Sequence, residues 1–241
     1  SSFILKILLG TLRLGIAENT VMDALAIAFT GSKDNRKFLE NAYNVSSDLG
    51  KVAETIVAKG IDGISDFHIT LFNPIRPMLA ERVKSEAEAI EKLGDKFSAE
   101  YKLDGERVQI HIKDDMVILF SRSLENITSY YPDIVEKIPK KINSKEAILE
   151  AEAVAINENT GEFLPFQELM HRRRKYKIEK AVTQYPISVN LFDVLYYDAE
   201  SCLEKPYENR RGILEKITQE DEFVKLIPMT IIHNENEIED F

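Results

Sequence analysis

The chain of 241 residues has no tryptophan and a single cysteine, Cys202. One cysteine excludes an intrachain disulfide and a structural zinc site built on several thiolates. No apolar run approaches the roughly 18 to 20 residues of a membrane span, since Lys6, Gly10 and Arg13 interrupt the apolar N-terminal stretch. These absences predict an intracellular protein without a membrane or secretory segment, which would be cytoplasmic in a prokaryote or an archaeon and nuclear in a eukaryote.

Positive charge is also scarce, because 31 Lys and Arg stand against 41 Asp and Glu and give a net charge of −10. The imbalance lies in residues 81–241, since residues 1–80 contain 8 basic and 8 acidic residues. Non-specific affinity for nucleic acid comes from many cations that displace counterions. The acidity therefore argues against a protein that coats polyanions, and any phosphate-binding site must be local.

Apolar residues make up 44% of the chain, which is enough for a folded core. Residues 1–70 have helical periodicity. A capping-box-like pattern at Thr20 predicts a helix that ends at Gly31. A second helix is expected to begin at residue 46 or 47 and to stop at Gly60.

Two prolines, Pro74 and Pro77, break this pattern and predict a domain boundary after residue 76. Beyond it, the apolar period changes from helical to alternating, which is typical of strands. The expected elements are a helix at 85–93, a hairpin of 108–112 with 116–120, and strands at 147–156 and 187–196. The second part is therefore expected to be α+β with a largely antiparallel sheet.

Two carboxylates, Glu150 and Glu152, stand on one face of the strand predicted at residues 147–156. Aliphatic residues flank them on that face. A buried carboxylate needs a cation, a hydrogen-bond donor or water, so the pair is a candidate site. The alternative is an ordinary solvated strand face.

A second candidate lies just before the hairpin. If this segment is extended, Glu100, Lys102 and Asp104 share one face. Gly105 then permits a turn or a close backbone approach. Such alternation of charge taken alone is usually an ordinary surface strand.

In the strand at residues 187–196, strict alternation places Phe192 on the face opposite to Asp193. Phe192 is either a core residue or a platform on which a base could stack. Asp193 would share an apolar face with Leu191 and Leu195, which predicts a structural hydrogen bond or a partner cation.

One strongly basic run stands out in this acidic chain and is a candidate for phosphate binding. The alternative is a solvated helix face. The cations of the run are Arg172, Arg173, Arg174, Lys175 and Lys177.

The sequence Lys102-Leu-Asp-Gly-Glu-Arg107 matches the K-x-D-G-x-R signature of covalent nucleotidyltransferases. Its setting resembles the ATP-dependent DNA ligases of archaea and eukaryotes, and further segments resemble motifs of that family in the same order. These segments are residues 120–134, 149–155 and 191–195, and 12–16 and 74–80 resemble the family on either side of its domain boundary.

The resemblance implies an α+β fold in two parts. Residues 1–76 would be the C-terminal part of a helical DNA-binding domain. Residues 77–241 would be the N-terminal, antiparallel-sheet part of a nucleotidyltransferase (ATP-grasp-like) adenylation domain. The implied function is sealing of nicks in duplex DNA during replication, repair and recombination.

The resemblance also implies roles for individual residues in three steps of chemistry. Lys102 would attack the α-phosphate of ATP and form lysyl-AMP, the AMP would move to the 5′-phosphate of the nick, and the 3′-hydroxyl would displace it. Glu100 would recognise adenine, and Phe192 would stack on it.

Three further residues would complete the nucleotide site. Arg107 and Arg122 would bind the ribose and phosphates, and Glu152 would bind the ribose or a water on Mg²⁺. ATP and Mg²⁺ are thus the implied cofactors, and nicked duplex DNA is the implied partner, with its backbone on the run at residues 172–177. A sliding clamp would bind through regions outside this chain.

Parts of the family pattern are missing. The later E-G-[LV]-x-x-K motif and a second lysine pair are not found in the sequence, and Ser1 opens directly into a helical pattern. We therefore expect a central fragment of a ligase. The alternatives are an RNA ligase, an mRNA-capping nucleotidyltransferase, or a catalytically incompetent nucleic-acid-binding module. The helical segment before Pro74 and the position of Glu100 favour DNA ligase.

Overall fold

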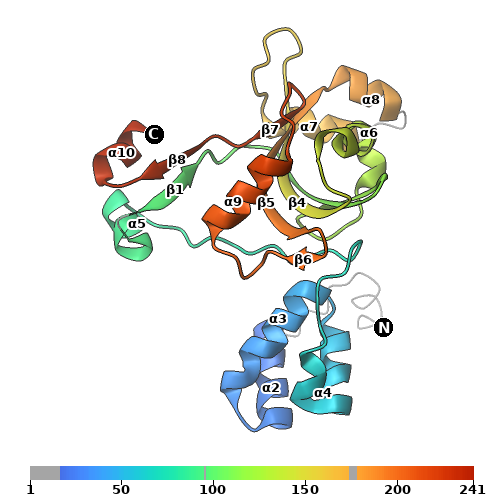
Figure 1. Ribbon diagram of the computed structural model, residues 1–241, viewed down its shortest axis with the longest axis vertical. Helices are drawn as coiled ribbons and strands as arrows, with labels where there is room; N and C mark the ends of the chain where they lie inside the picture. The colour runs from blue at the N-terminus through green and yellow to red at the C-terminus, as the bar shows by residue number, and fades with distance from the viewer. Residues whose placement is uncertain (1–16, 95, 174–177) are drawn as a thin grey trace, which may run out of the picture. The chain divides into compact units, whose positions relative to one another are not determined.

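The computed structural model describes residues 17–94, 96–173 and 178–241. The chain divides into two compact units, Ser1–Arg76 and Pro77–Phe241. Each unit has its own apolar core, and each is described by itself (Figure 1).

The described part of the first unit is helical. It consists of α2 (Glu18–Thr30), the 3₁₀ turn η1 (Lys33–Asn35), α3 (Arg36–Ser46) and α4 (Leu49–Ile64). These helices pack around one apolar cluster. Its buried members are Met22, Leu39, Ala42, Tyr43, Val52, Ile56 and Ile64.

The helix ends correct several sequence expectations. α2 ends at Gly31 in the left-handed conformation, as predicted, but it begins at Glu18, so Thr20 lies inside it and forms no cap. α3 was not predicted, because most of its residues are polar. α4 begins after Asp48, whose side chain caps it, and continues past Gly60 although Gly60 itself is not helical. The φ of 68° and ψ of −162° at Gly60 interrupt the helix at the predicted position, and a second helical segment continues to Ile64.

A six-stranded sheet forms the centre of the second unit. Its strand order is β3-β2-β4-β5-β6, and β7 pairs with β5. All of these pairings are antiparallel except that of β5 with β7. The strands are β2 (Glu106–Lys113), β3 (Met116–Ser121), β4 (Glu146–Ala155), β5 (Ile187–Tyr197), β6 (Glu200–Ser201) and β7 (Val224–Leu226).

This sheet confirms the predicted hairpin of β2 with β3, the strands at β4 and β5, and the α+β class. Alternation along β4 has the predicted consequence. Leu149 and Ala151 belong to the main apolar cluster, whereas Glu150 and Glu152 stand on the opposite face. One face of the sheet is therefore a core face, and the other carries the polar groups.

Helices cover the core face. The apolar cluster includes Ile134 and Ile138 of α6 (Pro132–Lys141), Leu169 of α7 (Phe166–Arg173), and Leu214 of α9 (Tyr207–Ile217). The turn η2 (Thr128–Tyr130) leads into α6, and α8 (Ile178–Gln184) leads into β5.

A second, two-stranded sheet joins β1 (Phe97–Glu100) to β8 (Met229–Ile232). The predicted helix α5 (Glu86–Leu93) and the terminal helix α10 (Glu235–Asp240) lie against it (Figure 1). The helix expected at 85–93 begins one residue later, because Ser85 caps α5 through its side chain. None of the helices in the described ranges is long and apolar enough to cross a membrane.

Candidate functional site

A cleft of about 1150 Å³ opens on the polar face of the six-stranded sheet. Its lining includes all six residues that the sequence predicted for a nucleotide site, although they come from distant parts of the chain. They are Glu100, Lys102, Arg107, Arg122, Glu152 and Phe192. Apolar side chains of Met78 and Leu79 also line it and are otherwise exposed to solvent.

Lys102 stands in the loop that joins β1 to β2, because β1 ends at Glu100 and β2 begins at Glu106. The segment is therefore not a strand, and the condition under which Glu100, Lys102 and Asp104 would share one strand face is not met. The Lys102 side chain is exposed, and its Nζ donates a hydrogen bond to the carbonyl of Leu103 at 3.3 Å. The amine is thus held in the cleft by its own loop.

Gly105 fixes this loop against β4. A Cβ at this position would lie 2.3 Å from the carbonyl oxygen of Ala153, which is far inside van der Waals contact. The Gly105 N–H donates a hydrogen bond to Oε1 of Glu152 at 3.1 Å. The close approach predicted for this glycine is therefore present, and it brings the Lys102 loop next to a carboxylate.

Glu152 is partly buried, and burial is the largest cause of a pKa above its usual value. Lys102 and the Gly105 N–H lower this pKa and so oppose the effect. Among the described residues, no group of three or more His, Cys, Asp or Glu side chains is placed to hold a metal ion.

Glu150 is buried, and Arg107 neutralises its charge. Hydrogen bonds link the carboxylate to further polar side chains. Its Oε2 accepts a hydrogen bond from Arg107 Nε at 2.8 Å, and its Oε1 accepts one from Gln109 Nε2 at 2.9 Å. Gln109 Oε1 in turn lies 2.9 Å from His111 Nε2. The partner cation required for a buried carboxylate is therefore Arg107. The sequence analysis missed Gln109 and His111, although both stand on the Glu150 face of the predicted hairpin.

The pKa of His111 is lowered to about 3 because the ring is buried. The imidazole is therefore neutral near pH 7, so this chain of side chains adds no second cation beside Arg107.

Phe192 lies in a β-bulge. Its neighbours Leu191 and Asp193 pair with Ala151 and Glu150, so Phe192 is the extra residue of β5. The bulge shifts the alternation and turns Asp193 to the face of Glu150, so the expected position of Asp193 beside Leu191 is wrong. Phe192 lines the cleft, with the Arg107 guanidinium 5.5 Å from its ring centroid.

Asp193 was expected to have a structural hydrogen bond or a partner cation. The structure shows that its partner cation is Arg210. The Nε and Nη2 atoms of Arg210 donate to the two carboxylate oxygens at 2.7 and 3.0 Å. A paired fork of this kind fixes both side chains. It joins β5 to helix α9, which also carries Tyr207 and Arg211.

Glu100, at the end of β1, contacts two residues of α9. The Tyr207 hydroxyl donates a hydrogen bond to Oε1 of Glu100, and Nη1 of Arg211 lies 3.6 Å from the same oxygen. Neither Tyr207 nor Arg211 was predicted to belong to the site, because 107 positions of the sequence separate Tyr207 from Glu100. Arg122 is exposed at the edge of the cleft.

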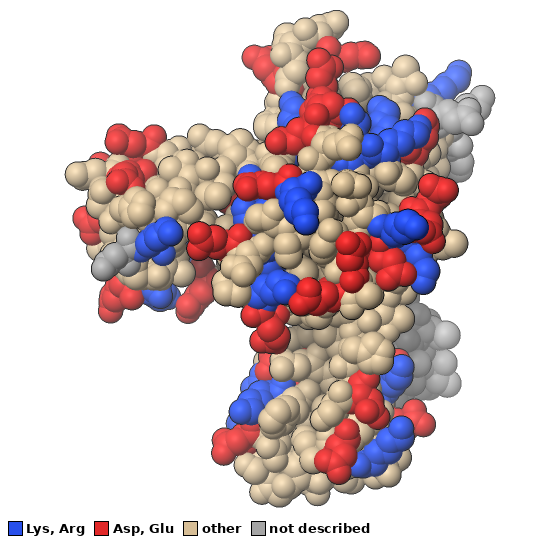
Figure 2. Space-filling view, viewed as in Figure 1, with Lys and Arg blue, Asp and Glu red and all other residues tan. Residues whose placement is uncertain are grey.

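The basic run predicted to contact DNA is only partly described. Arg172 is buried and forms two hydrogen bonds with Asp133, at 3.2 and 2.6 Å, and one with the carbonyl of Tyr185. Its assignment to DNA binding is therefore withdrawn, because its guanidinium holds α7 to α6. The side chain of Arg173, and residues Arg174, Lys175 and Lys177, lie outside the described part. On the face drawn in Figure 2, the described Lys and Arg alternate with Asp and Glu and form no continuous basic surface.

Comparisons with known proteins show the family of this chain. A family model described as an ATP-dependent DNA ligase domain matches residues 77–241. Over 241 residues, the chain is 74% identical to a DNA ligase of Nitrosopumilus maritimus, all of the chain matching 41% of that protein. A DNA ligase of Cenarchaeum symbiosum is 63% identical, with 99% of this chain matching 40% of that protein. The chain thus spans about two fifths of the length of these relatives.

Among solved structures, one match is the ligase domain of M. tuberculosis LigD. The match is 21% identical in sequence, has a TM-score of 0.43, and covers 56% of this chain and 40% of that chain.

Proposed function

The chain belongs to the ATP-dependent DNA ligase domain family, and we propose that its cleft is the lysine-charging site of an enzyme that seals nicks in duplex DNA. In this proposal Lys102 accepts AMP from ATP and passes it to the 5′-phosphate of the nick. The observation that carries the proposal is the single cleft around Lys102, which gathers carboxylates, arginines and an aromatic ring from four separate segments.

The residues of the cleft suit the first chemical step. The neutral Nζ of Lys102 attacks the α-phosphorus of ATP, a P–N bond forms, the bond to the bridging oxygen breaks, and pyrophosphate leaves. The proton of the ammonium group must depart before attack. Negative charge grows on the phosphate oxygens during this step, so fixed cations on the cleft wall lower the barrier. Arg107 and Arg122 line the cleft where they could supply that charge.

Arg107 is suited to this role because its position is set before substrate binds. Glu150 accepts a hydrogen bond from its Nε and is itself held by Gln109, so the guanidinium loses little freedom when it meets a phosphate or ribose. Arg107 lines the cleft with its guanidinium 5.5 Å from the ring centroid of Phe192, and we expect its two Nη atoms to contact the nucleotide.

Base binding is assigned to Phe192 and Glu100. The bulge in β5 presents the Phe192 ring to the cleft, where a purine could stack on it. Glu100 stands on the cleft wall with an acceptor oxygen for the amino group of adenine.

Mg²⁺ fits Glu152 in part. Mg²⁺ is usually bound by one or two carboxylates together with substrate phosphates and water, and not by an all-protein cage. One carboxylate beside the phosphate-accepting lysine satisfies that pattern. When bound, the ion would neutralise charge on the phosphates.

The DNA substrate implies further assignments. We assign residues 1–76 to the end of a helical DNA-binding domain, and residues 77–241 to the first part of an adenylation domain. The run Arg173, Arg174, Lys175 and Lys177 is proposed to bind the DNA backbone. Replication, repair and recombination follow from nick sealing, and an intracellular location follows from all three.

A chimera tests the proposal. This sequence would replace the matching region of the Nitrosopumilus maritimus ligase, which is 74% identical to it. With radiolabelled ATP and a denaturing gel, the chimera should acquire one covalent AMP and seal a nicked duplex, and Lys102→Ala should lose both activities. Peptide mapping that finds AMP on another lysine would refute the assignment, and Lys96→Ala serves as a matched control because this lysine is outside the K-x-D-G-x-R motif.

A further inference from the structure

Glu100 is held from one side by helix α9. Tyr207 is the first residue of that helix, and Arg211 follows one turn later on the same face. Both residues contact the same carboxylate oxygen, Oε1. Within the described ranges, Oε2 of Glu100 has no hydrogen-bond or ion-pair partner, so it is available to a ligand in the cleft that Glu100 lines.

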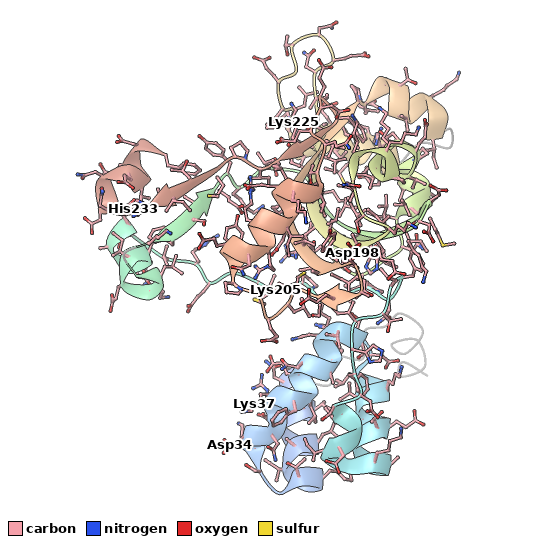
Figure 3. All side chains as sticks on the ribbon, in the orientation of Figure 1. Asp34, Lys37, Asp198, Lys205, Lys225 and His233 are labelled. Atoms are coloured by element: carbon pink, nitrogen blue, oxygen red, sulfur yellow. The ribbon has the colours of Figure 1, made fainter. Side chains whose placement is uncertain are left out.

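The position of α9 is itself fixed. Arg210 forms its fork with Asp193 and also donates through Nη1 to the carbonyl of Lys205, at 2.6 Å. Lys205, which Figure 3 labels, lies just before the helix. Arg211 donates to the carbonyl of Ile227 at 3.0 Å. These contacts anchor the first turn of α9, so Tyr207 and Arg211 meet Glu100 from a rigid element.

The protonation state of this carboxyl decides what it can recognise. An ionised carboxylate only accepts hydrogen bonds, whereas a protonated one can also donate. A 6-amino purine offers a donor at its 6-position, and a 6-keto purine offers an acceptor there. Whatever keeps Glu100 ionised therefore makes it select the amino group.

We propose that Tyr207, assisted by Arg211, is a positioning residue that holds Glu100 as an ionised acceptor and so makes the cleft discriminate 6-amino from 6-keto purine nucleotides. The proposal deepens the proposed function, because it requires that the base lie against Glu100. Tyr207 itself touches the carboxylate and not the base.

The charged surroundings of Glu100 agree with this role. Burial raises its pKa above the usual range, and Asp193 adds to that effect. The Tyr207 hydrogen bond and Arg211 lower the pKa and so work in the opposite direction. Burial also raises the pKa of Tyr207, so its hydroxyl remains protonated and donates. Removing the hydroxyl should therefore leave Glu100 partly protonated at a higher pH.

The experiment measures binding of AMP and IMP to the 241-residue chain by calorimetry, because the two nucleotides differ at the 6-position of the base. The chain should prefer AMP. Tyr207→Phe should reduce the preference by about tenfold, the usual scale for one hydrogen bond to a charged group. Tyr196→Phe is the matched control, since it also removes a tyrosine hydroxyl bonded to a glutamate, Glu146, at 3.3 Å outside the cleft lining. It should leave the preference unchanged.

A pH series gives a readout that a merely structural role would not change. AMP affinity should fall as the pH drops through the pKa of Glu100, and in Tyr207→Phe the fall should begin at a higher pH. Arg211→Gln, which removes the nearby cation, should shift the curve in the same direction. This second variant keeps the test decisive if Tyr207→Phe does not fold.

The possible outcomes separate the two proposals. If Glu100→Gln abolishes the AMP preference while Tyr207→Phe and Arg211→Gln keep the wild-type ratio and pH curve, the positioning role is wrong and the nucleotide site stands. If the wild-type chain binds neither nucleotide, or Glu100→Gln leaves the preference intact, the assignment of Glu100 to the base is wrong and the positioning role with it.

Discussion

Arg107 is a clear case of one side chain with two duties. Its ion pair with Glu150 joins a partly exposed guanidinium to a carboxylate whose side chain is only 1% exposed. Removing one partner of such a pair leaves a buried charge, which typically costs about 3–5 kcal/mol. An alanine at position 107 would therefore lose stability as well as a phosphate-binding cation, so its effect on turnover is interpretable only beside a thermal melt.

Gly105 gives the sharpest prediction at this scale. Gly105→Ala should destabilise the chain by about 1–3 kcal/mol, the usual cost of overpacking, because its Cβ would meet the backbone oxygen of Ala153 at 2.3 Å. It should also move the Lys102 loop away from Glu152, so AMP transfer in the chimera should fall. Urea unfolding and the adenylation gel measure the two effects.

Gly212→Ala is the control for this change. Gly212 lies inside α9, and a Cβ there would have no atom within 4 Å. Alanine in an open helical position stabilises by about 0.5–1 kcal/mol. If Gly105→Ala lowered the stability of the chain no more than Gly212→Ala does, this result would contradict the close packing of the loop on β4.

Burial of the His111 ring should make the stability of the folded chain fall in acid. Its pKa is about 3 in the folded chain, and about 6.5 when the chain is unfolded. Between these values the unfolded state binds more protons, so stability is complete above pH 6.5 and is lost as the pH falls toward 3. At pH 5 the loss should be about 2 kcal/mol.

Urea unfolding at pH 7, 6 and 5 measures this dependence. His111→Asn keeps a polar side chain that does not titrate, so its stability should fall less steeply over the same interval. His233→Asn is the control, because this ring, labelled in Figure 3, is exposed to water. Equal slopes in the wild type and His111→Asn would show that the fold does not lower the pKa of the imidazole.

At the scale of elements, strand β5 explains where sequence reasoning succeeded and failed. The apolar, β-branched run predicted the strand to within one residue. The run could not reveal the bulge at Phe192, because a bulge depends on the register with β4 and leaves the composition unchanged. Because strict alternation took no account of this extra residue, it predicted Asp193 on the wrong face of the sheet.

The residues of the candidate site also divide into those that the sequence predicted and those that it did not. The K-x-D-G-x-R motif, alternation along β4 and the ordered segments that resemble the ligase family predicted six of the residues that line the cleft, since these signals are local in sequence. Tyr207 and Gln109 were missed, because what they contribute is a contact with Glu100 or Glu150 across the fold. The first α helices were also less predictable than the strands, because polar surfaces obscured their ends.

Substitutions in the basic run at residues 172–177 should have two different effects, one on stability and one on DNA binding. Arg172→Ala should lower the stability of the chain by about 3–5 kcal/mol, because Asp133 would remain buried without its partner. Arg174→Gln with Lys175→Gln should leave the melting temperature unchanged and weaken binding of the chimera to nicked DNA of any sequence. Thermal melts and fluorescence anisotropy measure these effects.

The salt dependence distinguishes backbone contacts from a general loss of charge. The slope of log K against log salt should flatten by about 0.9 for each phosphate contact removed. Substituting Lys37, an exposed lysine of α3 labelled in Figure 3, by glutamine supplies a charge-matched comparison. If the double variant at residues 174 and 175 keeps the wild-type slope, the run is a solvated surface.

At the scale of the whole molecule, the acidic second unit bears on DNA binding. The net charge of −10 opposes approach to a polyanion, and nine of the 19 described Lys and Arg of the second unit are paired with carboxylates. Affinity for a nick must therefore come from a few placed cations and from the helical unit, and not from the overall field. Binding of the 241-residue chain should accordingly be weak and only modestly salt-dependent, because the slope of log K against log salt scales with the number of phosphates neutralised.

The last prediction concerns the activity of these 241 residues alone. The sequence contains no E-G-[LV]-x-x-K motif and no second lysine pair, and it spans about 41% of a relative that is 74% identical. Charge on a departing pyrophosphate needs cations on several sides, and Arg107 and Arg122 line the cleft from β2 and the end of β3. We therefore expect the chain to bind AMP through Phe192 and Glu100, yet to acquire little covalent AMP and to seal no nicks, while the chimera does both. Mass spectrometry after incubation with ATP, with a nicked-duplex assay beside it, measures these activities, and efficient sealing by the chain alone would show that the cleft is already electrostatically complete.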